Sequence, residues 1–106
     1  MGKFEIFLGI DSQYYFRFVA SNGRQIISSE GYKTRQGCEG GVASVKRLAP
    51  YDSTYRRADN PGNYRFNMVA ENGEIIARSS EGYVAQAGRE NAIEVVKKDA
   101  PSAFVF

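Results

Sequence analysis

Ser28-Ser29-Glu30-Gly31-Tyr32 occurs twice in this chain, because the same five residues return as Ser79-Ser80-Glu81-Gly82-Tyr83. An Asn-Gly pair lies upstream of each copy, at Asn22-Gly23 and at Asn72-Gly73. A Val-Lys pair and then an Ala-Pro pair follow each copy. Because these landmarks come in the same order in both halves, the chain is a tandem repeat.

The length of the chain indicates how the two repeats fold. With 106 residues, a single domain buries roughly 65% of the surface of its unfolded chain. A half of about 50 residues lies near the size at which a core is marginal without metals or disulfides. We therefore predict one domain over 1–106 with one shared core, in which repeats 1–57 and 53–106 have the strand 53–57 in common.

The composition is that of an ordinary globular protein, with 42% hydrophobic and 25% charged residues. No apolar run approaches the roughly 20 residues that a membrane span needs, and the N-terminal residues do not resemble an export signal. The single cysteine, Cys38, has no partner within the chain for a disulfide. We therefore expect a cytoplasmic protein without a membrane anchor.

Histidine is absent from the sequence. The usual general base, the usual partner of a serine or cysteine nucleophile and the commonest metal ligand are therefore missing. The net charge of +2 is too small to indicate a polyanionic partner by itself. We expect a protein that is not an enzyme and that has no cofactor and no metal site.

Alternating apolar residues predict strands at 3–9, 14–20, 53–57 and 64–70, and an apolar C-terminal segment predicts a last strand at 103–106. Each Asn-Gly pair predicts a two-residue type I′ hairpin turn. Counting outward from the first turn pairs Ala20 with Gln25, Val19 with Ile26, Phe18 with Ile27 and Phe16 with Ser29. The same count in the second copy pairs Ala70 with Ile75 and Val69 with Ile76.

This register predicts that the two Val-Ile pairs lie on the sheet face opposite to that of Phe16 and Phe66. Together with Phe7 they would form an exposed apolar strip on that face. The second copy has one extra residue between its Asn-Gly pair and its Ser-Ser-Glu-Gly-Tyr motif. An extra residue within a strand reverses the facing of all later side chains unless a bulge absorbs it. We predict that bulge near Ala77-Arg78.

Apolar residues then recur at intervals of three and four, which predicts one amphipathic helix after each motif: Val42, Val45, Leu48 and Ala49, then Ala92, Ile93, Val96 and Ala100. Thr34 is a suitable N-cap for the first helix, whereas the corresponding Ala85 has no side-chain oxygen. Pro50 and Pro101 end the helices.

Taken together, these features resemble the YegP-like family of small, mostly uncharacterised bacterial proteins, over nearly the whole chain. The residues that carry the resemblance are Phe4-Glu5-Ile6, Tyr15-Phe16-Arg17-Phe18, Tyr64-Arg65-Phe66, the Asn-Gly pairs with their Ile-Ile, both Ser-Glu-Gly-Tyr motifs, Val42-Ala43-Ser44-Val45-Lys46 and Ile93-Glu94-Val95-Val96-Lys97. The resemblance implies an α+β fold of tandem β-β-β-α-β repeats. The two repeats would exchange their last strands within one antiparallel sheet and place both helices on one face. The family brings no known activity, catalytic residue or cofactor.

The repeated motif is a candidate binding site for a small polar ligand, through Ser29, Glu30, Tyr32, Ser80, Glu81 and Tyr83. A structural role is the favoured interpretation. Gly31 and Gly82 would supply the backbone angle of the turn from strand to helix, and each tyrosine would bury its ring. Cys38 near a helix N-terminus could have a lowered thiol pKa, but no base or second thiol accompanies it, so an incidental cysteine is favoured.

The leading functional hypothesis is an interaction module that binds a protein partner or a small ligand. The alternative is weak nucleic-acid binding through the uncovered face of the sheet, where Phe7, Tyr15 and Arg17 would form a stacking platform with a cation beside it. Tyr15 corresponds to Arg65 and Arg17 to Asn67 in the second copy, so this platform is not repeated. We expect a monomer with an internal pseudo-two-fold axis, with scope for weak self-association.

Overall fold

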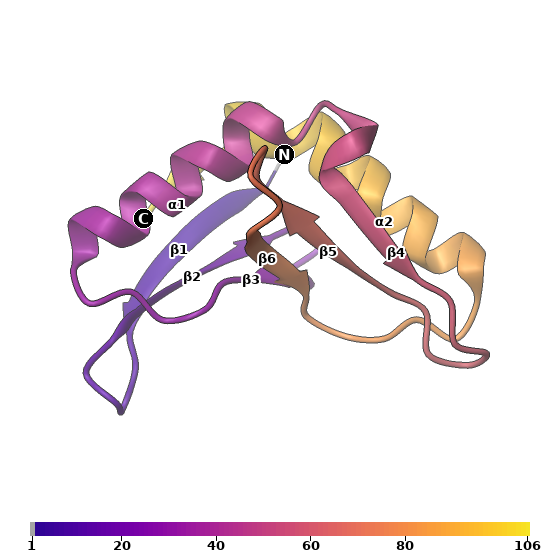
Figure 1. The fold of residues 1–106 in the computed structure, drawn as a ribbon, viewed down its shortest axis with the longest axis horizontal. Coiled ribbons are helices and arrows are strands. Elements are labelled where there is room, and N and C mark those ends of the chain that lie inside the picture. Colours follow the sequence, from indigo (N-terminus) through magenta and orange to yellow (C-terminus); the bar gives the residue numbers. More distant parts are fainter. Residues whose placement is uncertain (1) are drawn as a thin grey trace.

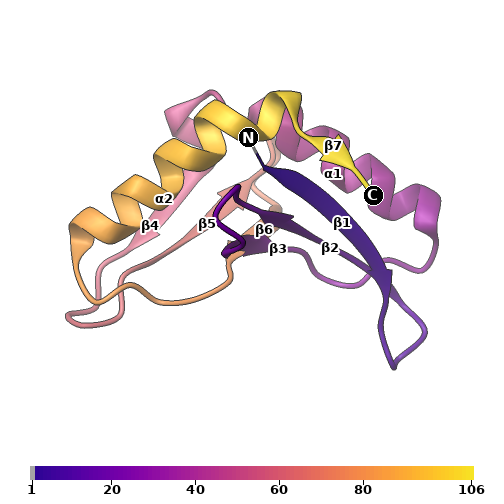
Figure 2. The same ribbon diagram turned by 180° about the vertical axis from the view of Figure 1, so that it is seen from behind.

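The computed structural model describes residues 2–106, which form one twisted sheet with both long helices on the same face (Figure 1; Figure 2). The strand order is β4-β5-β6-β3-β2-β1-β7. In chain order the elements are β1 (Lys3–Leu8), β2 (Tyr14–Val19), β3 (Gln25–Ser28), α1 (Arg35–Leu48), β4 (Tyr55–Ala58), β5 (Arg65–Val69), β6 (Ile75–Ser79), α2 (Gln86–Asp99) and β7 (Phe104–Val105). Short 3₁₀ helices at Asp52–Thr54 and Ala100–Ser102 precede β4 and β7.

Each repeat gives its last strand to the other half of the sheet, as the family resemblance implied. Strand β4 follows α1 but pairs with β5, and β7 follows α2 but pairs with β1. Tyr55 of β4 lies opposite Met68 as Phe4 of β1 lies opposite Phe18, so β4 has the place in the second half that β1 has in the first. The expectation of a wholly antiparallel sheet is wrong, because β7 runs parallel to β1.

The two halves meet at the centre of the sheet, where β3 and β6 pair over only two residue pairs, Ile27 with Ser79 and Ser28 with Arg78. The N–H of Ser80 extends this junction by donating to the carbonyl of Ile26 at 2.9 Å. The direct pairing between the two halves is therefore a short antiparallel contact between equivalent strands, and the exchanged strands β4 and β7 join the repeats further.

The turns at the Asn-Gly pairs are not type I′, because Asn22 does not have positive φ and only Gly23, at φ 85°, does. The N–H of Gly23 donates to the carbonyl of Ala20, and Ala20 in turn donates to Arg24. This is a three-residue hairpin loop with its glycine in the left-handed region. Ala20 therefore faces Arg24 instead of the predicted Gln25, and the second hairpin repeats this with Ala70, Gly73 and Glu74.

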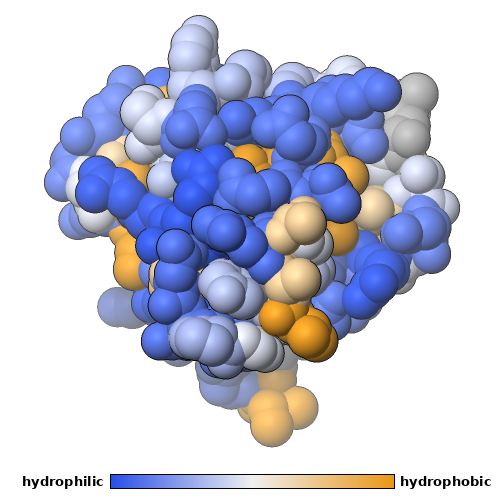
Figure 3. Space-filling view, turned by 90° about the vertical axis from the view of Figure 1, so that its right-hand side faces the viewer, coloured by the Kyte–Doolittle hydropathy of each residue, from blue (hydrophilic) through white to orange (hydrophobic). Residues whose placement is uncertain are grey.

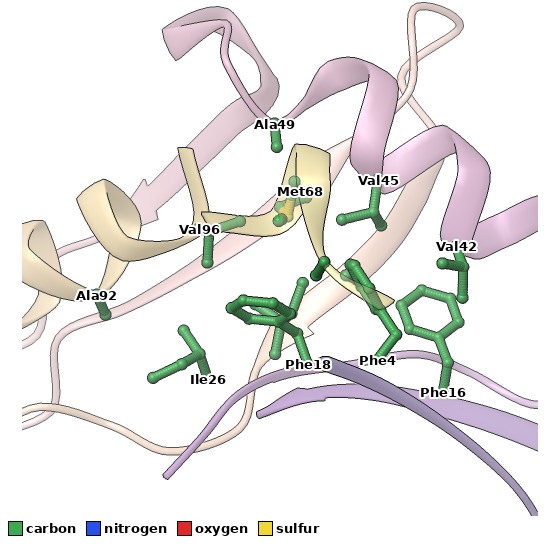
Figure 4. Packing of buried hydrophobic residues seen from close by; sticks show 14 of the residues in the cluster. Phe4, Phe16, Phe18, Ile26, Val42, Val45, Ala49, Met68, Ala92 and Val96 are labelled. Atoms are coloured by element: carbon green, nitrogen blue, oxygen red, sulfur yellow. The ribbon is translucent and has the colours of Figure 1, made fainter. Parts of the chain in front are cut away.

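A bulge at the second residue of β3 and of β6 then restores the predicted register. Phe18 lies opposite Ile27 as predicted, but Val19 lies opposite Gln25, so Ile26 is the extra residue. Met68, Val69 and Ile76 repeat this arrangement. The bulge turns Ile26 into the core beneath the helices (Figure 4), so the predicted apolar strip of Val-Ile pairs on the open face does not exist.

The extra residue of the second copy is not in the strand, so the predicted bulge near Ala77-Arg78 is wrong. The hydroxyl of Ser29 accepts a hydrogen bond from the N–H of Phe16, and the hydroxyl of Ser79 accepts one from Phe66. Ser29 therefore corresponds in space to Ser79, although the motif aligns it with Ser80. The chain accommodates the additional residue in the loop between Ser79 and Tyr83.

Both helices begin where the sequence predicts. The hydroxyl of Thr34 caps α1 by accepting from the N–H of Gly37 at 3.0 Å, whereas Ala85 provides no side-chain cap for α2. The apolar stripes of the helices pack on aromatic residues of the sheet, with Phe4, Phe16 and Phe18 at the centre (Figure 4). Tyr32 lies so close to α1 that a Cβ on Gly41 would collide with its hydroxyl oxygen, which explains a glycine inside that helix.

Candidate functional site

Ser29, Glu30 and Glu81 of the repeated motif take part in side-chain contacts within the protein, whereas the buried hydroxyl of Ser80 has no hydrogen-bond partner among residues 2–106. The hydroxyl of Ser29 also donates to the carbonyl of Glu30 at 2.9 Å. Glu30 pairs with Arg78 of the second repeat at 3.2 Å, and Glu81 pairs with Arg24 of the first repeat at 2.6 Å. The two glutamates thus join the repeats to each other across the β3–β6 junction.

The motif tyrosines fix the chain between strand and helix. The backbone of Tyr32 pairs with Tyr14, and that of Tyr83 pairs with Tyr64, in each case through two hydrogen bonds of 2.8 Å. Both rings are half-buried, and burial raises the pKa of both phenols. These contacts suit a structural role for the motif, while its binding of a small ligand stays a prediction.

Gly31 and Gly82 do not adopt positive φ, so the prediction that the turn needs their left-handed conformation is wrong. Their Cβ atoms would instead collide with the side chains of Gln13 and Asn63, which lie against the turn. The close approach of a neighbouring side chain is therefore the feature that favours glycine at both positions.

Cys38 and Arg89 occupy equivalent positions in the first turns of α1 and α2, and both are buried. Burial raises the pKa of the Cys38 thiol, which contradicts the alternative of a lowered pKa and agrees with the favoured interpretation of an incidental cysteine. Arg89 is 1% exposed and is held by Asp59, by Glu90 at 2.9 Å and by the carbonyl of Ala58. Its guanidinium also lies over the ring of Tyr64, 5.6 Å from the centroid.

Phe7, Tyr15 and Arg17 do lie together on the open face. The rings of Phe7 and Tyr15 are stacked with centroids 5.8 Å apart, and the guanidinium of Arg17 lies 5.0 Å from the Phe7 centroid. Arg17 also pairs with Glu5 at 2.8 Å, and the hydroxyl of Tyr15 donates to Asp11. The platform therefore exposes aromatic rings, but its cation is already partnered by a carboxylate.

Two of the predicted sets of site residues meet in one shallow groove of about 570 Å³. Phe7, Ile10 and Tyr15 form its apolar wall, and Ser28 and Ser29 form its polar side. The second repeat has Ala58 and Arg65 opposite each other where the first has Phe7 and Tyr15, so it lacks the aromatic wall.

A row of polar side chains across the open face was not predicted. Directly paired residues place Glu5, Arg17, Ser28, Arg78, Asn67 and Arg56 side by side on six successive strands. Arg17, Arg78 and Arg56 lie on every second strand of this row, so neighbouring arginines are about 10 Å apart. Only the strand pairing brings these residues together, because no local sequence pattern contains them.

Large apolar side chains are exposed mainly at one end of the sheet, formed by β1, β2 and β7, which we call the first-repeat end. Eight such side chains are exposed among residues 2–106, and six of them lie at this end: Phe7, Leu8, Ile10, Phe104, Val105 and Phe106. Leu8 is 59% exposed, Phe104 69% and Phe106 65%. Both groups come from apolar segments of the sequence. The parallel pairing of β7 with β1 places Phe104 beside Lys3 at the start of β1, while Leu8 and Ile10 lie at the far end of β1 and in the turn that follows it.

The opposite end of the sheet, formed by β4 and β5, is the second-repeat end and is hydrophilic for the most part (Figure 3). Arg57 of β4 pairs with Asp52 and with Glu90, each at 2.9 Å. Lys97 of α2 pairs with Asp52 at 2.8 Å, and Arg89 adds Asp59 to the network. Hydrogen bonds from Arg57, and next from Lys97, lower the pKa of Asp52 to about 2.

Comparisons with known proteins match this architecture to one family. The model described as "Domain of unknown function (DUF1508)" matches residues 11–55 and again residues 59–106. The chain belongs to this family. A UPF0339 protein encoded in the ptx operon 5′ region of Stutzerimonas stutzeri is 42% identical over 105 residues, covering 98% of this chain and 94% of the relative. YegP of Escherichia coli K12 is 35% identical with the same coverage.

Two solution NMR structures share the fold. The structure of a UPF0339 protein from Shewanella oneidensis matches with a TM-score of 0.90 and 28% identity, covering 98% of this chain and 88% of the other. The E. coli YegP structure matches with a TM-score of 0.89 and 35% identity, covering 98% and 90%. The YegP-like resemblance is thus confirmed, and with it the tandem α+β fold. The matched proteins carry no defined function.

Within the described part of the chain, 2–106, no helix has the length and apolarity that crossing a membrane requires. Among the same residues, acidic and cysteine side chains do not gather in threes at a site that would hold a metal ion.

Proposed function

We propose that this protein is a non-enzymatic interaction module that binds a protein partner through its first-repeat end. The observation that carries the proposal is the concentration of exposed apolar side chains there, where Leu8, Ile10 and Phe104 are each more than half exposed. Exposed large apolar side chains that gather at one end of an otherwise polar protein are typical of a protein interface. The pseudo-equivalent second-repeat end has an ion-pair network in its place, so the shared fold does not require the apolar surface.

The chemistry of the remaining candidates supports a role without catalysis. Glu30 and Glu81 are paired with arginines, and the Cys38 thiol is buried with a raised pKa. A nucleophile needs an adjacent base or a lowered pKa. Cys38 has no histidine to activate it, because the sequence contains none.

Site-specific photocrosslinking in the cells that express the protein tests the proposal. A photoreactive residue at Ile10 should give a protein adduct, and one at Asn60, the corresponding position in the β4–β5 turn, should not. The adduct should disappear in the double variant Leu8→Ser/Phe104→Ser, which keeps its fold because both side chains are exposed. Equal adducts at both positions, or an adduct that survives the double variant, would contradict a specific interface.

Single-stranded nucleic acid is the second candidate ligand, and the arginine row of the open face favours it. Arg56 forms no ion pair with any acid among residues 2–106, and the Phe7–Tyr15 stack at the end of the row offers a ring for base stacking. Against it, Arg17 and Arg78 are already paired with Glu5 and Glu30. Binding would have to exchange these carboxylates for phosphates.

Titration of a single-stranded oligonucleotide at two salt concentrations tests this candidate. If the row binds phosphates, affinity falls steeply with salt, and Arg56→Ala reduces the salt slope by about one. Arg47→Ala is the matched control, because Arg47 lies on α1 and pairs with Glu71. Absence of binding at low salt would remove the candidate.

A further inference from the structure

The outer edge of β7 is open, and its backbone groups are arranged for one kind of pairing. The N–H of Phe106 donates to the carbonyl of Phe4, and Ile6 donates to the carbonyl of Phe106, both at 2.8 Å. Successive residues of a strand direct their backbone groups to opposite edges. The N–H and the carbonyl of Val105 therefore both point away from β1, toward solvent.

A residue with both groups directed outward can exchange two hydrogen bonds with its own copy across a two-fold axis. This is the hydrogen-bonded pair of an antiparallel ladder. With Val105 at the axis, Phe104 of one chain lies directly opposite Phe106 of the other on the open face, which gives two cross-strand aromatic pairs. The β3–β6 junction inside the chain is an antiparallel contact of the same small extent, with two residue pairs.

Helix α1, which lies beside β7, carries a stripe of residues whose charges suit the same two-fold axis. A shallow groove of about 270 Å³ between α1 and β7 is lined by Glu39, Val42, Ala43, Lys46 and Val105. The stripe on α1 has the acid Glu39 at one end, which also pairs with Arg35 at 3.5 Å, the base Lys46 at the other end and apolar residues between. A two-fold axis near Val105 makes the two α1 helices antiparallel, so the Glu39 end of each faces the Lys46 end of the other. The stripe is thus complementary in charge to itself.

The two edges of the sheet differ in their protection against such pairing. Strand β4 carries the consecutive charged residues Arg56 and Arg57, of the kind that protect exposed strand edges. The side chains of the β7 segment Phe104-Val105-Phe106 carry no charge, and the segment contains no proline. Association is therefore favoured at β7 and not at β4.

We propose that the first-repeat end binds a second copy of this chain, by antiparallel pairing of β7 with β7 about a two-fold axis at Val105. The proposal rests on the proposed function, since it names the partner of that surface. The contact is small, so it forms a weak dimer with a dissociation constant in the micromolar to millimolar range.

Sedimentation velocity from about 1 μM to about 1 mM protein tests the proposal. The wild-type chain should shift from monomer toward dimer. Val105→Pro removes one outward N–H from each copy and therefore, by symmetry, both hydrogen bonds between the copies. The dimer should weaken at least tenfold at about 1 kcal/mol per hydrogen bond. The unfolding midpoint of each variant shows that the monomer remains folded.

A charge swap tests the orientation of the two copies. Lys46→Glu should weaken the dimer, because two glutamates then face each other, and Glu39→Lys/Lys46→Glu should restore it. A wild-type chain that stays monomeric, or a double variant as weak as the single one, would overturn the proposal. If the chain is monomeric while residue 10 crosslinks to a different polypeptide, this proposal fails and the proposed function stands. If neither dimer nor adduct forms, both fail.

Discussion

The two ends of the sheet have the same backbone arrangement but are stabilised by different chemistry. At the second-repeat end the buried Arg89 is held by Asp59 and Glu90, whereas at the first-repeat end the equivalent position is the uncharged, buried Cys38. Asp59 corresponds to the exposed Leu8, because β4 and β1 have equivalent places. The comparison indicates that the buried cation is found where a neighbouring carboxylate is supplied, and that the end with Cys38 and Leu8 in these places has more exposed apolar side chains.

Placing the cation in the wrong repeat should have the strongest effect. Cys38→Arg would bury a guanidinium opposite Leu8, with no carboxylate in the place of Asp59, and should cost about 4 kcal/mol of unfolding free energy or more. Adding Leu8→Asp should recover part of this loss. Urea unfolding of the single and double variants measures both. A double variant no more stable than Cys38→Arg would show that Asp59 is not what makes Arg89 acceptable.

Replacing Arg89 should lower the free energy of unfolding by about 3 kcal/mol when the side-chain volume is lost, and by much less when the volume is retained. Arg89 is among the largest fully buried side chains, so Arg89→Ala leaves a cavity. Arg89→Met retains most of the volume and should stay within about 1.5 kcal/mol of wild type. Urea unfolding distinguishes the two variants. Equal losses would mean that the charge, and not the packing, is required.

The glycines of α1 should respond in opposite directions. Gly41→Ala pushes a methyl group into Tyr32 and to 3.0 Å from the ring of Phe16, and should cost about 1–2 kcal/mol despite the better helix propensity of alanine. Gly40→Ala meets no atom within 4 Å and should gain up to about 1 kcal/mol. Thermal unfolding of the pair is the measurement. A gain in both variants would show that Tyr32 moves aside freely.

The extent of the sequence-based prediction can be seen in particular residues. The repeat, both helices, the Thr34 cap and the strand exchange follow from periodicity and from the family resemblance. The prediction of type I′ turns is wrong because Asn-Gly also fits a three-residue loop, and the bulges at Ile26 and Ile76 then restore the register. The identical five-residue motif concealed that Ser29 corresponds to Ser79, since only the hydrogen bonds to Phe16 and Phe66 reveal the shift.

The candidate site was predicted less completely than the fold. The Phe7, Tyr15 and Arg17 cluster followed from strand alternation within one hairpin. The arginine row and the apolar first-repeat end depend on pairing between distant strands, which no local pattern contains. The burial of Arg89 depends on the partner carboxylate of Asp59, thirty positions away along the chain.

The helix caps should show a smaller difference between the repeats. Thr34→Ala removes the hydroxyl that accepts from Gly37 and should cost about 1 kcal/mol. Ala85→Thr adds a hydroxyl where α2 has none and should gain up to about 1 kcal/mol. Denaturant midpoints of the two single variants test this. A loss in the Ala85→Thr variant would mean that the start of α2 differs in geometry from that of α1.

Acid should weaken the ion network of the second-repeat end. Hydrogen bonds from Arg57 and Lys97 lower the pKa of Asp52 from 3.8 to about 2. The stabilisation from Asp52 is therefore present above pH 3.8 and is lost as pH falls toward 2. The stability difference between wild type and Asp52→Asn should shrink from neutral pH toward the acid end of this range in urea titrations. Glu74→Gln, which removes no ion pair among the described residues, is the control, and a difference independent of pH would contradict the assignment.

Calorimetry of the intact chain tests most directly whether strand exchange makes the two unlike ends one cooperative unit. The calorimetric and van't Hoff enthalpies of unfolding should agree within a single transition. Arg89→Ala should lower the midpoint of that whole transition without splitting it. Two transitions, or a variant in which only the second half unfolds early, would show that the repeats are stable separately.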